Sequence, residues 1–141
     1  RRMVARVLVP MDDSEMAERA LEYAIDAHPD AEISVLHVVG EPSATMGEAV
    51  GLALEDDVER AAEALAEDVL DRAREIASDA GVDVETEVRW GSPAKVIVGM
   101  ADDFDVVVVG SHGGGLAERL FVGNIAKTVF QRSPVPVTVV R

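Results

Sequence analysis

Two kinds of hydrophobic pattern alternate along this chain. Residues 4–9 and 33–39 are short apolar runs rich in valine, isoleucine and leucine, which is typical of buried strands. From 14 to 28 the apolar residues instead recur every three or four positions, as on one face of a helix, and Ser14 is placed to cap that helix. The pattern therefore predicts a strand, a helix and a second strand, in that order.

The middle of the chain predicts a loop, a long helix and an edge strand. Residues 40–52 show little periodicity, whereas apolar residues at helical spacing run from 54 to 80, with Gly81 where a C-terminal cap belongs. The segment 82–90 then alternates strictly, with charged residues at every second position. Such alternation is typical of a strand with one wet face at the edge of a sheet.

The last third predicts two helices and two strands. Ser92 and Pro93 have the residue types of a helix cap and first turn. Residues 105–109 are apolar on both faces, which is typical of a central strand. A helix is expected over 124–132, followed by a final strand within 133–141 whose prolines favour an edge position.

This alternation of strands and helices predicts an α/β fold in which a parallel sheet has helices on both faces. The 141 residues suit a single domain, 1–141. In an open parallel sheet, ligands bind beyond the carboxyl ends of the strands, where the strand order reverses. Two loops are equipped for this: "PMDDS" after the first strand and "GSHGGGLAERLFVGN" after the fourth.

The glycine-rich loop has the features of an anion site. Glycines allow positive φ and close approach of a ligand to the backbone, and the following helix begins with free N–H groups. Phosphate is the obvious anion, and a loop whose glycines only turn the chain is the alternative. The loop is not a Walker A motif, because Leu116 and Ala117 stand where Lys and Ser or Thr are required. No glycine follows the first strand, which also argues against a dinucleotide fingerprint.

Composition narrows the classes of partner. The formal net charge is −14, which disfavours nucleic acid and anionic membrane surfaces, and no apolar run is long enough to span a membrane. The chain has no cysteine, so a thiolate metal site and a cysteine nucleophile are excluded. We expect a cytoplasmic protein. The excess of acidic residues, with lysine only at Lys95 and Lys127, is expected of a protein from a salt-rich cytosol, and an ordinary acidic mesophilic protein is the alternative.

The glycine-rich loop resembles the nucleotide loop of the universal stress protein family. That family spaces its glycines as Gly, two residues, Gly, nine residues, Gly, and Gly110, Gly113 and Gly123 match this spacing. The segments "VLVPMDDSEMAERAL", "VLHVV" and "SPVPVTVV" resemble the family's strands, so the likeness covers essentially the whole chain. It implies an open doubly wound sheet of five strands in the order 3-2-1-4-5.

The resemblance also implies an adenine nucleotide, ATP in part of the family, with AMP or ADP as alternatives. Mg²⁺ could accompany the nucleotide, although no dedicated set of metal ligands is visible. The implied binding residues are Pro10 and Asp12 at the adenine or ribose, Val38 at the adenine, Val109 and Gly110 at the ribose and first phosphate, and Gly113, Gly123, Asn124 and Ile125 at the phosphates. His112 either contacts phosphate or the partner subunit, or is an exposed loop residue.

Asn124 departs from the family pattern, which has Ser or Thr there in the members that bind ATP. An Asn amide can donate to a phosphate and Asn is a good helix cap, but the side chain is larger than a hydroxyl. An empty site is therefore the alternative.

No catalytic group is assigned. Asp12 and Asp13 are adjacent on a turn and should point apart, and the histidines at 28, 37 and 112 lack metal spacing. Ser111 lacks the elbow of a serine hydrolase. No base is poised for phosphoryl transfer, so turnover should be slow or nil.

The last strand carries Val135, Val137 and Val139 and would form a sticky edge unless covered. Antiparallel pairing with the same strand of a second copy would cover it, and the resemblance implies the same homodimer. The preferred function is a nucleotide-binding sensor or regulator in the stress response. The alternatives are a nucleotide-free dimeric scaffold, an enzyme of adenylate chemistry, and a flavodoxin-like electron carrier, which the few aromatic residues disfavour.

Overall fold

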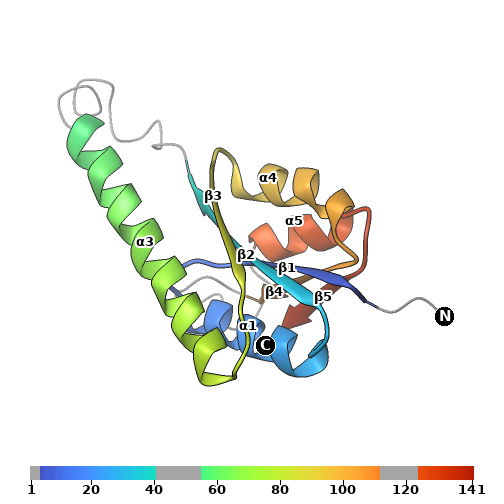
Figure 1. Cartoon of the computed structure of the whole chain (residues 1–141). Helices are drawn as coiled ribbons and strands as arrows, with labels where there is room; N and C mark the ends of the chain where they lie inside the picture. The colour runs from blue at the N-terminus through green and yellow to red at the C-terminus, as the bar shows by residue number, and fades with distance from the viewer. Residues whose placement is uncertain (1–3, 41–54, 112–123) are drawn as a thin grey trace.

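A computed structural model describes residues 4–40, 55–111 and 124–141. Its centre is one five-stranded sheet in the order β3-β2-β1-β4-β5, and every neighbouring pair is parallel (Figure 1). This confirms the predicted fold class and strand order. The strands are β1 (Arg6–Pro10), β2 (Glu32–Val39), β3 (Glu85–Trp90), β4 (Val106–Gly110) and β5 (Val137–Val140).

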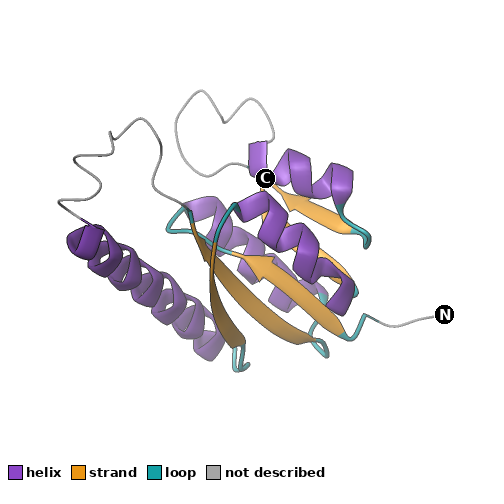
Figure 2. Cartoon of the chain, turned by 90° about the horizontal axis from the view of Figure 1, so that it is seen from above, coloured by secondary structure: helices purple, strands orange, loops and turns teal. Residues whose placement is uncertain are grey.

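Helices cover both faces of the sheet (Figure 2). Helices α1 (Glu15–Ala27) and α3 (Glu55–Asp79) pack on one face, and α4 (Pro93–Met100) and α5 (Asn124–Arg132) pack on the other. A 3-10 turn at Ala101–Asp103, which the sequence pattern does not predict, follows α4. In the described parts of the chain, no helix has the length and apolarity to cross a membrane.

The sheet separates two hydrophobic clusters, because successive side chains of a strand point to opposite faces. In β1, Val7 and Val9 belong to the cluster under α1 and α3, whereas Leu8 belongs to the cluster under α4 and α5. All three are fully buried. The middle of β1 and Val106–Val109 of β4 are therefore apolar on both faces, as predicted for the fourth strand, and β4 lies between β1 and β5.

The two predicted helix caps differ in outcome. The Ser14 hydroxyl accepts a hydrogen bond from the Ala17 amide at 3.1 Å, which confirms the cap of α1. Ser92 occupies the cap position of α4, but its side chain makes no capping hydrogen bond, so that part of the prediction is wrong. Only its backbone carbonyl participates, by accepting from the Val96 amide at 3.0 Å.

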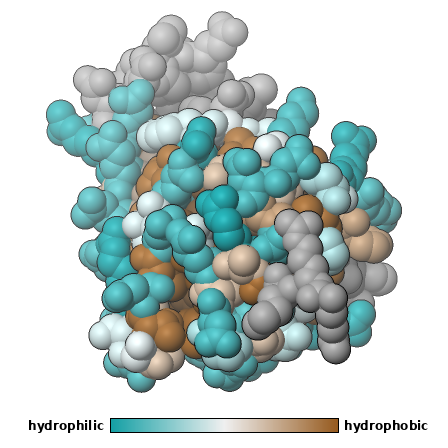
Figure 3. All heavy atoms as spheres, turned by 45° about the vertical axis from the view of Figure 1, so that its right-hand side comes forward, coloured by the Kyte–Doolittle hydropathy of each residue, from teal (hydrophilic) through white to brown (hydrophobic). Residues whose placement is uncertain are grey.

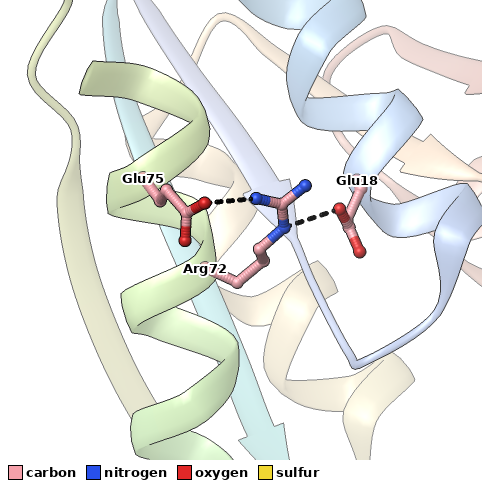
Figure 4. Close-up of polar contacts among 3 residues, drawn as sticks. All are labelled: Glu18, Arg72 and Glu75. Atoms are coloured by element: carbon pink, nitrogen blue, oxygen red, sulfur yellow. Dashed lines mark hydrogen bonds and ion pairs between the residues drawn. The ribbon is translucent and has the colours of Figure 1, made fainter. Parts of the chain in front are cut away.

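An ion pair joins the two helices on one face of the sheet. The Arg72 guanidinium of α3 contacts Glu18 of α1 and Glu75 of its own helix, each at 2.9 Å (Figure 4). The hydrogen bond and the charge of Glu18 are the main reasons that the pKa of Arg72 is raised. Because the pair is exposed, its role is to orient the helices rather than to supply much stability.

Two predicted apolar faces are less covered than their patterns suggest. On α3, Ala66 is the first buried residue among those described, and Leu65 is 42% exposed, because the first turns of the helix extend past the sheet (Figure 1). On β3, Val88 and Trp90 are exposed, although they lie on the face of the strand predicted to be dry. That prediction is wrong for the carboxyl end of this edge strand.

On the face drawn in Figure 3, hydrophilic side chains are spread over the surface with hydrophobic areas between them. Several arginines form short-range pairs with neighbouring carboxylates, such as Arg74 with Asp71 at 2.8 Å and Arg19 with Glu15 at 3.2 Å. These pairs are local to one helix. The chain as a whole has 27 Asp and Glu against 13 Lys and Arg.

Replacing Gly81 by Ala should lower the free energy of unfolding by about 1 kcal/mol, because Gly81 ends α3 with φ at +76°, which a side chain disfavours. Gly99→Ala is the matched control. Gly99 lies inside α4 with open space around it, so alanine there should raise stability by up to about 1 kcal/mol. Urea unfolding of both variants checks the opposite signs, and a stabilising Gly81→Ala would contradict the assignment.

Candidate functional site

A cavity of about 540 Å³ opens at the carboxyl ends of β1 and β4. These strands are neighbours at the centre of the sheet. The helix after β1, α1, and the helix after β4, α5, lie on opposite faces of the sheet. The two connections therefore diverge and leave a crevice between them. The residues that line the cavity are Pro10, Met11, Asp12, Ser14, Ala17, Leu36, Val38, Pro93, Ile97, Val109, Gly110, Asn124, Ile125 and Ala126.

Most of this lining is apolar. Leu36 and Val38 of β2 and Val109 of β4 present side chains from one face of the sheet, and α4 adds Pro93 and Ile97. Such walls suit the flat faces of a heterocyclic base. Among the described lining residues, the polar side chains lie at the turn after β1 and at the beginning of α5.

The turn after β1 holds the acidic group of the cavity. Oδ1 of Asp12 accepts a hydrogen bond from the Ser14 amide at 2.9 Å, which closes a turn of the kind that Asp commonly forms with its own backbone. The Ser14 hydroxyl in turn caps α1. Among the described residues, Oδ2 of Asp12 accepts no hydrogen bond, so this exposed oxygen is available to a ligand.

Residue Met11, one position earlier, is held to β2 through both its backbone amide and its backbone carbonyl. Its amide donates to the Leu36 carbonyl at 2.8 Å, and its carbonyl oxygen lies 2.8 Å from Nδ1 of His37. A carbonyl can only accept, so Nδ1 carries the proton and donates. His37 is only 6% exposed, which confirms the prediction that it sits in a buried strand.

The other loop leaves β4 at Gly110, which packs directly against α1. A Cβ atom at this position would lie 2.9 Å from both the carbonyl carbon and the carbonyl oxygen of Met16. Real Cβ atoms do not approach a backbone so closely. The glycine is therefore required by the packing of strand on helix, in addition to any approach of a ligand.

The beginning of α5 forms the remaining polar wall. Asn124 and Ile125 are both exposed at the cavity, and Ala126 is buried beneath them. The first N–H groups of a helix lack acceptors within the helix and attract anions. In this turn the Thr128 hydroxyl donates to the Asn124 carbonyl at 2.9 Å.

The structure brings most of the predicted binding residues together. Those that line the cavity are Pro10, Asp12, Val38, Val109, Gly110, Asn124 and Ile125. Three further predicted residues, His112, Gly113 and Gly123, lie outside the described residues. Asp13 and Ser111 do not line the cavity; the Ser111 amide instead donates to the Val140 carbonyl at 2.8 Å.

The sequence reasoning missed the contribution of α4 and of the first turn of α1. Pro93 and Ile97 reach the cavity because α4 lies against α5 above the crevice. Ser14 and Ala17 reach it because α1 begins at the cavity rim. The sequence indicated the contribution of α4 only indirectly, because the apolar residues of this helix have to cover the sheet face that carries Leu36 and Val38.

Comparisons with known proteins agree on one family. A sequence profile described as "Universal stress protein family" matches residues 3–141. The universal stress protein YxiE of Bacillus subtilis is 31% identical over 148 residues, which cover 99% of this chain and 100% of that protein.

Two solved structures are similar over nearly the whole chain. The hypothetical protein MJ0577 superposes with a TM-score of 0.76 at 28% identity, covering 99% of this chain and 96% of the other. A universal stress protein in complex with cAMP superposes with a TM-score of 0.71 at 28% identity, covering 99% of both chains.

Replacing Gly110 by Ala should lower the free energy of unfolding by about 1–3 kcal/mol, because the added methyl group collides with the α1 backbone. Gly40→Ala is the control, since nothing lies within 4 Å of the Cβ position there. Denaturant titration of both variants measures the difference. Equal stability of the two variants would mean that β4 and α1 are not packed as described.

Proposed function

This chain belongs to the universal stress protein family, and we propose that it binds an adenine nucleotide, ATP, in the cavity between β1 and β4. The observation that carries the proposal is the form of this cavity. It combines apolar walls with a carboxylate at one end and a helix N-terminus at the other. A base, a sugar with hydroxyl groups and an anionic tail need these three environments.

Each part of a nucleotide has a suitable environment here. The adenine would lie against Val38 and Ile97, and Oδ2 of Asp12 would accept from a ribose hydroxyl. The phosphates would lie toward the first N–H groups of α5, where the helix dipole favours negative charge. The relative that was solved in complex with cAMP supports the same class of ligand for this chain.

The lining supports a sensor or regulator rather than a rapid enzyme. Among the described cavity residues, Asp12 is the single carboxylate, and none is a histidine, lysine or arginine. Phosphoryl transfer needs charge stabilisation and a group that orients the nucleophile. We therefore propose that the protein acts in the cytoplasm and that its interactions with other molecules change when a nucleotide is bound. It would hydrolyse that nucleotide slowly or not at all. Mg²⁺ would enter with the phosphates.

We further propose that a second copy of the chain covers the edge strand β5, as the pattern of valines predicts. The backbone groups of Pro136 and Val140 face β4, because their carbonyls accept from Val107 and Ser111. By the alternation of a strand, the N–H groups of Val137 and Val139 then point to the open edge. The neighbouring helix α5 carries Phe130, which is 55% exposed and would extend the apolar contact.

Isothermal titration calorimetry with Mg·ATP tests the proposed ligand, and Asp12→Asn should weaken binding about tenfold or more. Asparagine keeps an oxygen for the Ser14 amide but loses the charged Oδ2 acceptor. Asp13→Asn is the matched control, because it removes the same charge from a neighbour that does not line the cavity. If the wild-type protein binds neither ATP nor AMP, the dimeric scaffold is the better account.

The dimer is tested by Val139→Pro, which removes an outward N–H group while leaving the N–H groups that face β4. Size-exclusion chromatography with light scattering should then find a monomer, whereas Val139→Thr, which keeps the N–H, should remain dimeric. Removal of residues 135–141 should likewise give monomer or aggregate. A soluble dimer of either the proline variant or the truncated chain would overturn this interface.

A further inference from the structure

The buried histidine of β2 contributes to the site without lining it. Its neighbours Leu36 and Val38 point into the cavity, so the side chain of His37 points to the opposite face of the sheet, under α1 and α3. We propose that His37 is a positioning residue for ligand binding, because it holds the Met11–Asp12 turn at the cavity rim. This inference rests on the proposed nucleotide site and assigns its geometry to a residue outside it.

The bond from His37 replaces a backbone bond at the point where β1 ends. In the parallel ladder, Pro10 pairs with Leu36, and the Met11 amide extends the ladder by donating to the Leu36 carbonyl. Beyond this point the chain turns away into α1. The hydrogen bond to the Met11 carbonyl then comes from the His37 ring at 2.8 Å rather than from the next amide of β2.

The hydrogen bond from His37 to the Met11 carbonyl affects the position of Asp12 through the backbone. Met11 is 5% exposed and is held at both its amide and its carbonyl, so the peptide that begins Asp12 has a fixed orientation. The bond from the Ser14 amide to Oδ1 then fixes the carboxylate itself. Without the histidine donor, a buried carbonyl would lose its partner, and the turn would have to move to find water. The Asp12 carboxylate would move with it.

The position of the Nδ1 donor in the ring suggests two variants of His37, one that keeps a donor to the Met11 carbonyl and one that removes it. The amide nitrogen of Asn can occupy the position of Nδ1, so His37→Asn retains a donor to the Met11 carbonyl. His37→Leu is apolar and of similar size, and it has no donor. Ile33→Ala is the stability control, because Ile33 is a buried residue on the same face of the same strand, at the opposite end from the turn.

The experiment measures Mg·ATP affinity by calorimetry at a temperature where urea titration shows every variant folded. We expect His37→Leu to raise the dissociation constant about tenfold and His37→Asn to stay within about threefold of wild type. Ile33→Ala should lose stability and keep its affinity. A merely structural histidine would give the opposite result: Leu and Asn variants with equal affinities, or a loss of affinity in Ile33→Ala that matches its loss of stability.

Amide hydrogen exchange of the same proteins without nucleotide provides a second measurement. The amides of Met11 and Ser14 should exchange faster in His37→Leu than in His37→Asn, because both report on the turn. Unchanged exchange at both amides in His37→Leu would overturn the inference. If the wild type binds no ATP but these amides do respond, the proposed ligand is wrong while the role of His37 in holding the turn stands.

Discussion

The close contact of strand β4 with helix α1 is the constraint on which the rest of the site depends. Gly110 meets the Met16 backbone at a distance that leaves no room for a side chain. Strand β4 is paired with β1 at the centre of the sheet, and the close contact at Gly110 sets how near α1 lies to β4. The connections that follow the two strands therefore border one crevice. A larger residue at this position would push the helix away from the strand and move one wall of the cavity relative to the other.

Backbone hydrogen bonds and apolar packing, more than charged groups, shape this cavity. The turn after β1 is held by Met11 against β2 and by Asp12 against the start of α1, and the His37 ring acts on it from the far face of the sheet. Such a site is suited to recognising a ligand by its shape and a few directed hydrogen bonds.

The two edges of the sheet differ in a way that favours one of them for association. On β3, Glu85, Glu87 and Arg89 place charges along the strand, and Arg89 pairs with Glu87 at 2.7 Å. Charged side chains protect an edge from pairing with another chain. On β5 the residues are three valines and one threonine, all half-buried, and in the described part of the chain β5 is the last strand of the sheet. The apolar edge at β5 is therefore better suited to pairing with a second copy than the charged edge at β3.

The sequence by itself determined the order and type of the elements. Period-two and helical patterns reflect which faces must be buried, and the central strands, the Ser14 cap and the glycine that ends α3 follow from local chemistry. Through the family resemblance rather than through pattern alone, it also predicted seven of the fourteen described residues that line the cavity. Only the tertiary structure decided that Gly110 is needed by α1, that α4 supplies Pro93 and Ile97, and that Val88 and Trp90 are exposed. Those facts depend on where helices end relative to the sheet, and a periodic pattern shows which face of a helix is apolar but not what lies opposite to it.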